Sequence, residues 1–157
     1  MNNDNFTLDE LDKRILNALQ DNAARTNQEL AELVHASPPT CLRRVKRLTD
    51  SGVIARQVAL LAPEKIGAAL TAIVEITLDV QSSERLAEFE ELVAGELNVQ
   101  QCYRVSTGPD FILVIQVADM PAYHALAHRL FANQTNVRNV RSFFSVLRSK
   151  FETRIGV

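Results

Sequence analysis

The stretch that decides the fold of the first third of the chain is Ser37-Pro38-Pro39-Thr40-Cys41-Leu42-Arg43-Arg44-Val45-Lys46-Arg47-Leu48. A serine followed by a proline is typical of a helix start, because the hydroxyl caps a free backbone N–H and the proline fits the first helical position. Gly52 favours the left-handed conformation that ends a helix. The stretch therefore predicts a helix that starts after Ser37 and ends near Ser51.

This predicted helix has an apolar side and a basic side. On a wheel of roughly 100° per residue, the apolar side collects Cys41, Leu42, Val45 and Leu48. The opposite side carries Thr40, Arg43 and Arg47, and the flanks carry Arg44 and Lys46. We expect the apolar side to pack on other helices and the basic side to face an anionic partner.

Two further helices are predicted upstream. Thr7 with Glu10, and Thr26 with Glu29, form the capping-box pattern that marks a helix start. Apolar residues then recur at helical spacing, at Leu8, Leu11, Ile15 and Leu19 and again at Leu30 and Val34. His35-Ala36 leaves only a short turn before Ser37, and two helices joined by a turn of about three or four residues match a helix-turn-helix. The β-prone residues 53–61 predict a short strand or wing.

After Pro63 the pattern changes to strands alternating with amphipathic helices. Strands are predicted at 70–80, 99–106, 110–117 and within 137–151, and helices at 83–97 and 121–133. This order is the ferredoxin-like, split βαβ plan. We therefore predict an α+β chain, with a winged helix-turn-helix in residues 1–62 and a ferredoxin-like βαββαβ domain in residues 63–157.

The predicted sheet has a face that this chain does not cover. In the ferredoxin-like plan both helices lie on one face, so the apolar side chains of the other face need a further surface. We expect a homodimer formed through the sheet of residues 70–151.

Charge is distributed unevenly, although the net charge is only −2. Residues 1–35 carry −4, from three basic and seven acidic side chains, and residues 61–157 carry −2, from nine basic and eleven acidic ones. Residues 36–60 carry +4, from five basic side chains and the single acid Asp50. Such a basic patch predicts an anionic partner at one place, and its arginines suit double-stranded DNA because their planar forks pair with guanine or grip a phosphate.

The predicted helix after Ser37 is therefore interpreted as a DNA-recognition helix. Arg43 and Arg47 are expected to face the major groove, and Arg44 or Lys46 the phosphates. The Ser37 hydroxyl and the free amides of the helix N-terminus suit a backbone phosphate. The full set of predicted DNA-binding residues is Ser37, Pro39, Thr40, Arg43, Arg44, Lys46 and Arg47.

The chain resembles the Lrp/AsnC family of feast/famine regulators from about residue 7 to residue 154. The resemblance to the family's DNA-binding half is carried by the runs LDELDKRIL at 8–16, TNQELA at 26–31, SPPTCLRRVKRL at 37–48 and GVI at 52–54. The run DMPAY at 119–123 is similar to the family's amino-acid-responsive domain. The resemblance implies dimers built through the second domain, often assembled into octamers, and regulation by a small molecule, usually an amino acid.

The resemblance also points to an effector loop at Thr107, Gly108, Pro109 and Asp110. An amino acid offers an ammonium group to Asp110 and a carboxylate to the loop amides. Ser142 stands where the family often has threonine, so its hydroxyl is expected to complete the site. The loop departs from the family pattern, in which glycine usually occupies the position of Thr107. The alternative is a tight hairpin turn with a solvated Asp110.

Several other classes of protein fit less well. The longest uncharged run near the middle, residues 66–74, has 9 residues, whereas a membrane-spanning helix needs about 20. Met1–Asn5 lacks the basic and apolar stretches of a secretory signal, so we expect a cytoplasmic protein. His124 and His128 have metal-ligand spacing without an evident third ligand, so we predict neither a metal nor a cofactor.

Two function classes remain. The first is a sequence-specific, DNA-binding transcriptional regulator that responds to an amino acid. The alternative is a ferredoxin-like small-molecule-binding module or enzyme whose helix-turn-helix makes protein contacts. A protein-docking helix would more often carry apolar anchors where this one carries arginines, and no nucleophile–base pair is evident. We therefore predict a regulator and not an enzyme.

Overall fold

The computed structural model describes residues 7–157, which form two compact units. One unit runs to Leu60 and also includes Lys150–Val157, and the other comprises Leu61–Ser149. The C-terminal residues, which the sequence pattern assigned to the second domain, lie with the first unit because Arg154 and Ile155 hydrogen-bond to its first helix. The predicted absence of a secretory signal rests on Met1–Asn5, which lie outside the described residues.

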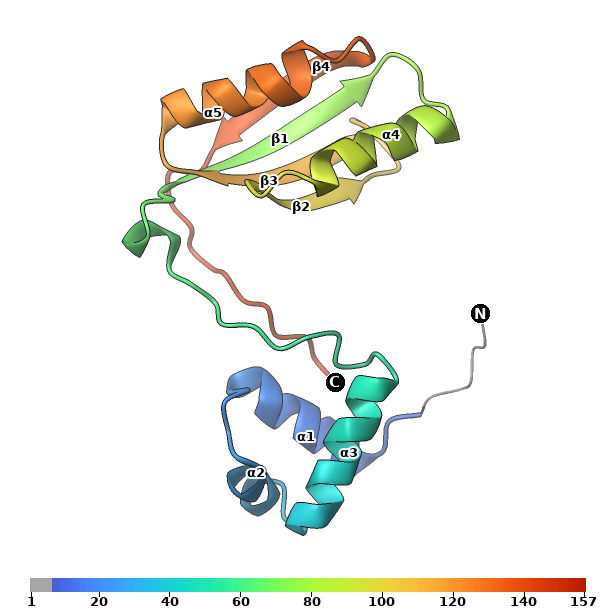
Figure 1. The fold of residues 1–157 in the computed structure, drawn as a ribbon, viewed down its shortest axis with the longest axis vertical. Helices are drawn as coiled ribbons and strands as arrows, with labels where there is room; N and C mark the ends of the chain where they lie inside the picture. The colour runs from blue at the N-terminus through green and yellow to red at the C-terminus, as the bar shows by residue number, and fades with distance from the viewer. Residues whose placement is uncertain (1–6) are drawn as a thin grey trace. The chain divides into compact units, whose positions relative to one another are not determined.

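The first unit contains three helices, α1 (Glu10–Asp21), α2 (Asn27–Leu33) and α3 (Pro38–Asp50) (Figure 1). Their buried core is made of Ile15, Leu16, Ala18, Leu30, Ala31, Val34, Cys41 and Leu48. α2 and α3 begin after the predicted caps, Thr26 and Ser37. The helix-turn-helix is thus confirmed. Cys41 is buried in its core, and this burial raises the pKa of the Cys41 thiol.

The capping box predicted at Thr7 and Glu10 is wrong. α1 is capped by Asp9, whose carboxylate accepts a hydrogen bond from the Asp12 N–H at 2.9 Å. The Asp12 carboxylate in turn accepts one from the Asp9 N–H at 3.1 Å. These two reciprocal bonds satisfy two of the free amides at the helix start, so the helix begins three residues after Thr7, at Glu10.

Two further features of the first unit differ from the expectation. Leu42 is 62% exposed rather than packed against α1 and α2, because it lies roughly 100° around the helix from Cys41 and outside the stripe of Cys41, Val45 and Leu48. Residues 53–62 contain no strand. A strand requires a hydrogen-bonded neighbour, and within residues 7–157 no segment pairs with this one.

The second unit is a four-stranded antiparallel sheet in the order β2-β3-β1-β4. The strands are β1 (Leu70–Leu78), β2 (Val99–Arg104), β3 (Phe111–Val117) and β4 (Val137–Phe144). β4 ends at Phe144 opposite Ala72, and the Ser145 N–H donates one further hydrogen bond to Thr71 O of β1. The predicted ferredoxin-like topology is confirmed.

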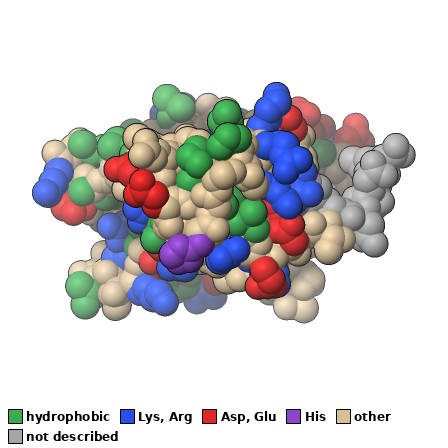
Figure 2. Space-filling view, turned by 90° about the horizontal axis from the view of Figure 1, so that it is seen from below, with side chains coloured by type: hydrophobic (Ala, Val, Ile, Leu, Met, Phe, Trp, Pro, Cys, Tyr) green, Lys and Arg blue, Asp and Glu red, His purple; other side chains and the backbone are tan. Residues whose placement is uncertain are grey.

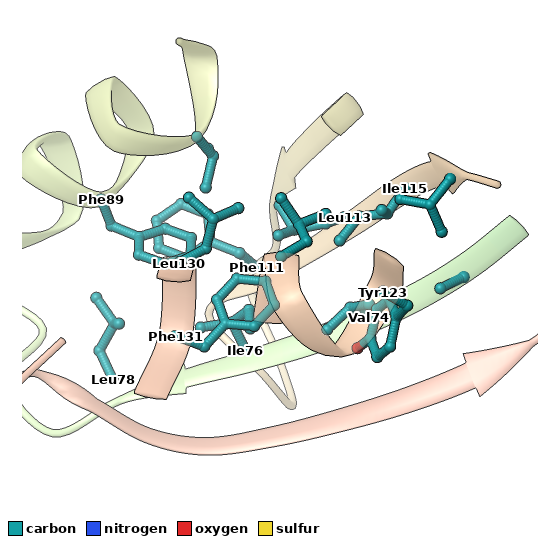
Figure 3. Close-up of a cluster of buried hydrophobic side chains, with 14 residues drawn as sticks. Val74, Ile76, Leu78, Phe89, Phe111, Leu113, Ile115, Tyr123, Leu130 and Phe131 are labelled. Carbon is teal, nitrogen blue, oxygen red and sulfur yellow. The ribbon is translucent and has the colours of Figure 1, made fainter. Parts of the chain in front are cut away.

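Helices α4 (Ser83–Ala94) and α5 (Met120–Ala127) cover one face of this sheet (Figure 1). Phe89 of α4 stacks on Phe111 of β3, and Leu130 and Phe131 enter the same core from the far end of α5 (Figure 3). α5 continues as a π-helical turn, η2 (His128–Ala132), rather than as one regular helix to Asn133. Leu130 and Phe131 of this turn are both buried.

The other face of the sheet carries exposed apolar side chains. Ile73 of β1 pairs with Phe143 of β4, and both side chains are more than two-fifths exposed. Tyr103 of β2 is also exposed and pairs with Ile112 of β3. We call the face formed by Ile73, Tyr103, Ile112, Val114 and Phe143 the open sheet face.

Candidate functional site

The outward surface of α3 is formed by Pro39, Arg43 and Lys46, all of which are exposed. They lie on the side of the helix opposite the buried stripe of Cys41, Val45 and Leu48. Within residues 7–157, no carboxylate lies within ion-pair distance of Arg43, whereas Lys46 lies 3.7 Å from Asp50 on the next turn. Arg43 is thus an exposed cation that forms no ion pair within the described part of the chain.

Arg44 and Arg47, by contrast, face α1. The Nη1 of Arg44 lies 2.6 Å from Asp9 Oδ2 and 3.3 Å from Asp12 Oδ1. Arg47 forms an ion pair with the other oxygen of Asp12, whose side chain is fully buried. We call these four residues the Asp–Arg cluster; it fastens the flank of α3 to the start of α1.

The electrostatics of the Asp–Arg cluster favour the charged state of both partners. The pKa of Asp9 is lowered, first by the hydrogen bond from the Asp12 N–H and further by the guanidinium of Arg44. The pKa of Arg44 is raised, mainly by its hydrogen bond to Asp9. Basic side chains accordingly lie directly beside acidic ones on this unit (Figure 2), so the positive patch predicted from the sequence is partly neutralised.

The N-terminus of α3 is exposed and locally capped. The Ser37 Oγ accepts a hydrogen bond from the Thr40 N–H at 3.4 Å and lies 2.8 Å from Thr40 Oγ1. The side-chain amide of Asn27 donates to the Pro38 carbonyl at 2.8 Å and so ties α2 to the start of α3. Ser37, Pro39 and Thr40 therefore lie together at one end of the outward surface.

The loop at residues 107–110 is a tight hairpin. The Val105 N–H donates to Asp110 O at 3.0 Å, and Gly108 has a φ of 88°, which a glycine adopts without strain. The Asp110 carboxylate accepts hydrogen bonds from the Leu78 N–H at 2.7 Å and from Gln81 at 3.3 Å, both through Oδ2. Asp110 thus holds the end of β1, and no donor in the described part of the chain binds its Oδ1.

Ser142 does not lie beside this loop within one chain. It stands on β4 opposite Val74 of β1, and β1 separates β4 from β3. Its hydroxyl is hydrogen-bonded to Tyr123 of α5, on the side of the sheet that the helices cover. The five predicted effector residues are therefore not brought together by a single protomer.

Sequence reasoning missed the roles of Asp9 and Asp12, although a signal was present. Asp12 occupies the same helical stripe as Leu8, Ile15 and Leu19, so it points into the core. A carboxylate at such a position requires a cationic or hydrogen-bonding partner. The sequence offers no comparable signal for Asn27 or for the bond between Tyr123 and Ser142.

Two family models match the chain. Residues 8–55 match a winged helix-turn-helix DNA-binding model, and residues 71–155 match the Lrp/AsnC ligand binding domain. Within residues 7–157 no helix has the length and apolarity required to cross a membrane.

Known proteins resemble the chain over nearly its full length. It is 35% identical over 150 residues to the DNA-binding transcriptional activator DecR of Escherichia coli, covering 96% of this chain and 99% of the relative. It is 34% identical to the leucine-responsive regulatory protein of the same species, covering 96% and 92%.

A solved transcriptional regulator from Neisseria meningitidis in complex with L-Met has a TM-score of 0.89 at 32% identity, covering 95% of this chain and 96% of that one. The two family models, the relatives and the fold of this chain all indicate a helix-turn-helix unit followed by an Lrp/AsnC ligand-binding unit. The chain therefore belongs to the Lrp/AsnC family of DNA-binding transcriptional regulators.

Proposed function

We propose that the outward surface of α3 reads double-stranded DNA through Arg43, with Lys46 on a phosphate. The observation that carries this assignment is the exposed position of Arg43, which forms no ion pair within residues 7–157. An arginine in this state loses no internal ion pair when it meets a guanine edge. Ser37, Pro39 and Thr40 lie at the N-terminal end of α3, where exposed amides suit a second phosphate.

Arg44 and Arg47 receive a different role from the one their sequence positions suggest. Because both are bound to Asp9 and Asp12, we propose that they set the orientation of α3 rather than read bases. This proposal is supported by the complete burial of Asp12, since breaking a buried pair leaves a carboxylate without compensation.

A gel-shift competition tests the DNA assignment. The probe is the DNA upstream of the protein's own gene, and the competitor is unrelated duplex of equal length. We expect wild type to bind the probe more tightly than the competitor. In Arg43→Ala, the difference in binding free energy between the two DNAs should shrink by about 1–3 kcal/mol, because the contact to one base is lost. Lys13→Ala, a basic residue of α1 paired with Glu10, is the matched control. An Arg43→Ala variant with unchanged preference would contradict the assignment.

The open sheet face supports a homodimer, and four such dimers would give the octamer that the family resemblance suggests. A two-fold dimer presents two copies of α3 to half-sites on DNA. The centres of these half-sites lie about one helical turn, or a multiple of it, apart.

We also propose that the protein acts in the cytoplasm, because a DNA-binding regulator of a bacterial type must reach the chromosome.

We further propose that an amino acid is the effector and that it binds at residues 107–110. The L-Met complex of the Neisseria relative supports the class of ligand, and the unused Oδ1 of Asp110 suits an ammonium group. Because Ser142 lies two strands from this loop, it would join the site only from a neighbouring subunit.

A thermal-shift panel of the amino acids tests the effector proposal. A ligand that binds only the folded assembly stabilises it by about 2.7 kcal/mol at a hundredfold excess over its Kd. We expect at least one amino acid to raise the melting temperature, and Asp110→Asn to abolish the rise. If no amino acid changes the melting temperature of the wild type, the effector proposal fails.

A further inference from the structure

A groove lies on the second unit between the C-terminal end of α5, the η2 turn and strand β4. Its volume is about 590 Å³, within the range of small-molecule sites. The lining is formed by His124, Ala127, His128, Phe131, Ala132 and residues 137–140. No part of the hairpin at residues 107–110 contributes to it, so the groove is separate from the proposed effector loop.

The polar lining of the groove consists of nitrogen donors and an amide. His124 and His128 lie one helical turn apart near the C-terminal end of α5, and Arg138 and Asn139 belong to β4. None of the described residues that line the groove carries a carboxylate. The site is therefore complementary to a negative charge.

Arg138 is an exception among the arginines of this unit. Arg104, Arg129 and Arg141 each form an ion pair, with Glu90, Glu96 and Glu75 respectively. Within residues 7–157, no carboxylate lies within ion-pair distance of Arg138, and neither histidine of the groove has a hydrogen-bond partner there. These three basic side chains therefore line one groove and are exposed to a bound anion.

The remaining lining is apolar and shaped by the π-helical turn. The buried ring of Phe131 and the side chains of Val137 and Val140 form it together with two alanines. π-helical turns are rare and occur often at functional sites. Here the turn covers His128–Ala132, so it places both His128 and Phe131 at the groove.

We propose that this groove binds a small carboxylate with a short apolar tail and no ammonium group. The carboxylate would pair with Arg138 and the histidines, and the tail would lie on Phe131 and Val140. A free amino acid would bring an ammonium group to a lining that holds three basic side chains and no acid. Two histidines without a third ligand fit an anion better than a metal ion, because no group of three metal-ligating side chains occurs within residues 7–157.

Ring-labelled histidine allows the proposal to be tested by NMR on the intact protein. Isovalerate is the probe, isovaleramide is its uncharged isostere, and L-leucine is the matching amino acid. The chain has three histidines, and His35 lies in the turn before α3, where it serves as an internal control. We expect isovalerate to shift the signals of His124 and His128 saturably and to leave that of His35 unchanged.

Variants on β4 make the test specific. Arg138→Gln and isovaleramide should each weaken binding by about tenfold or more, because each removes one charge of the ion pair. Arg141→Gln, an arginine of the same strand that is bound to Glu75, should bind isovalerate as wild type does. The proposal fails if millimolar isovalerate causes no saturable shift of the His124 and His128 signals. It also fails if Arg138→Gln and Arg141→Gln weaken binding equally, or if L-leucine binds more tightly than isovalerate.

Discussion

Asp12 is a single buried charge that ties α3 to α1. Its carboxylate is fully buried in α1 and holds Arg44 and Arg47 of α3. A buried ion pair adds little net stability compared with an apolar pair, but removal of one partner is costly. The Asp–Arg cluster therefore acts mainly as a lock on the position of α3, and it leaves Arg43 exposed for the DNA contact proposed above.

The lock predicts a large effect of Asp12→Ala. The substitution removes the partner of two arginines and one half of the capping box, so the free energy of unfolding should fall by about 2–4 kcal/mol. Urea denaturation measures this loss. Glu10→Ala, which breaks only an exposed pair with Lys13, should change the value by less than about 0.5 kcal/mol. Equal effects of the two variants would argue against the lock.

Acid should weaken the same cluster. The pKa of Asp9 lies below its ordinary value of 3.8, because the Asp12 N–H and Arg44 stabilise its charged form. The unfolded chain therefore takes up a proton at a higher pH than the folded chain, and protonation favours unfolding. The contribution is fully present above about pH 4 and is lost as the pH falls through the lowered pKa.

Melting curves recorded from neutral pH down to about pH 3 test this linkage. Asp9→Asn should flatten the acid decline relative to wild type. A residual decline is expected, because the pKa of Glu29 is also lowered by its hydrogen bonds to Thr26. An unchanged acid profile in Asp9→Asn would show that Asp9 carries no such linkage.

The turn between α2 and α3 carries the backbone strain of the helix-turn-helix. His35 has a φ of 54° and is the only non-glycine residue with positive φ within residues 7–157. Ala36 N–H closes the turn by donating to Ala31 O at 3.0 Å. The positive φ of His35 and this hydrogen bond together connect the end of α2 to the start of α3.

Substitutions at His35 should therefore follow backbone preference rather than side-chain chemistry. The side chain is exposed, so little packing is lost on replacement. His35→Val should lower the free energy of unfolding by about 1 kcal/mol, because a β-branched residue resists the left-handed region. His35→Asn should be neutral by the same denaturation assay, since asparagine tolerates that region. Equal stability of the two variants would contradict this account.

The presence and order of the helices and strands could be predicted from the sequence, because the spacing of apolar residues shows which face of each segment is buried. The caps at Thr26 and Ser37 and the stop at Gly52 were local signals of the same kind. Features that depend on a distant partner could not be predicted this way. These include the pairing of Arg44 and Arg47 with α1, the exposure of Leu42, and the C-terminal bonds between Ile155 and Gln20.

At the scale of the whole molecule, we expect a second copy of the chain to cover the open sheet face. The open sheet face leaves Ile73 and Phe143 in water in a monomer, which is unfavourable by roughly 25 cal/mol per Å² of apolar area. Phe143→Asp should therefore shift the mass seen by analytical ultracentrifugation toward the 17.5 kDa monomer. Leu97→Asp, at an exposed site outside this face, should leave the assembly unchanged. A wild type that is monomeric at micromolar concentration would refute the dimer.

The salt dependence of DNA affinity tests the central claim, that the outward surface of α3 binds DNA. Fluorescence anisotropy on the upstream DNA gives log Kobs against log salt for wild type, Lys46→Ala and Lys13→Ala. Each lost phosphate contact reduces the slope by about 0.9, so Lys46→Ala should reduce it by roughly 2 in a dimer. Lys13→Ala should match wild type. A Lys46→Ala slope equal to that of wild type, together with unchanged affinity of Arg43→Ala, would contradict the claim.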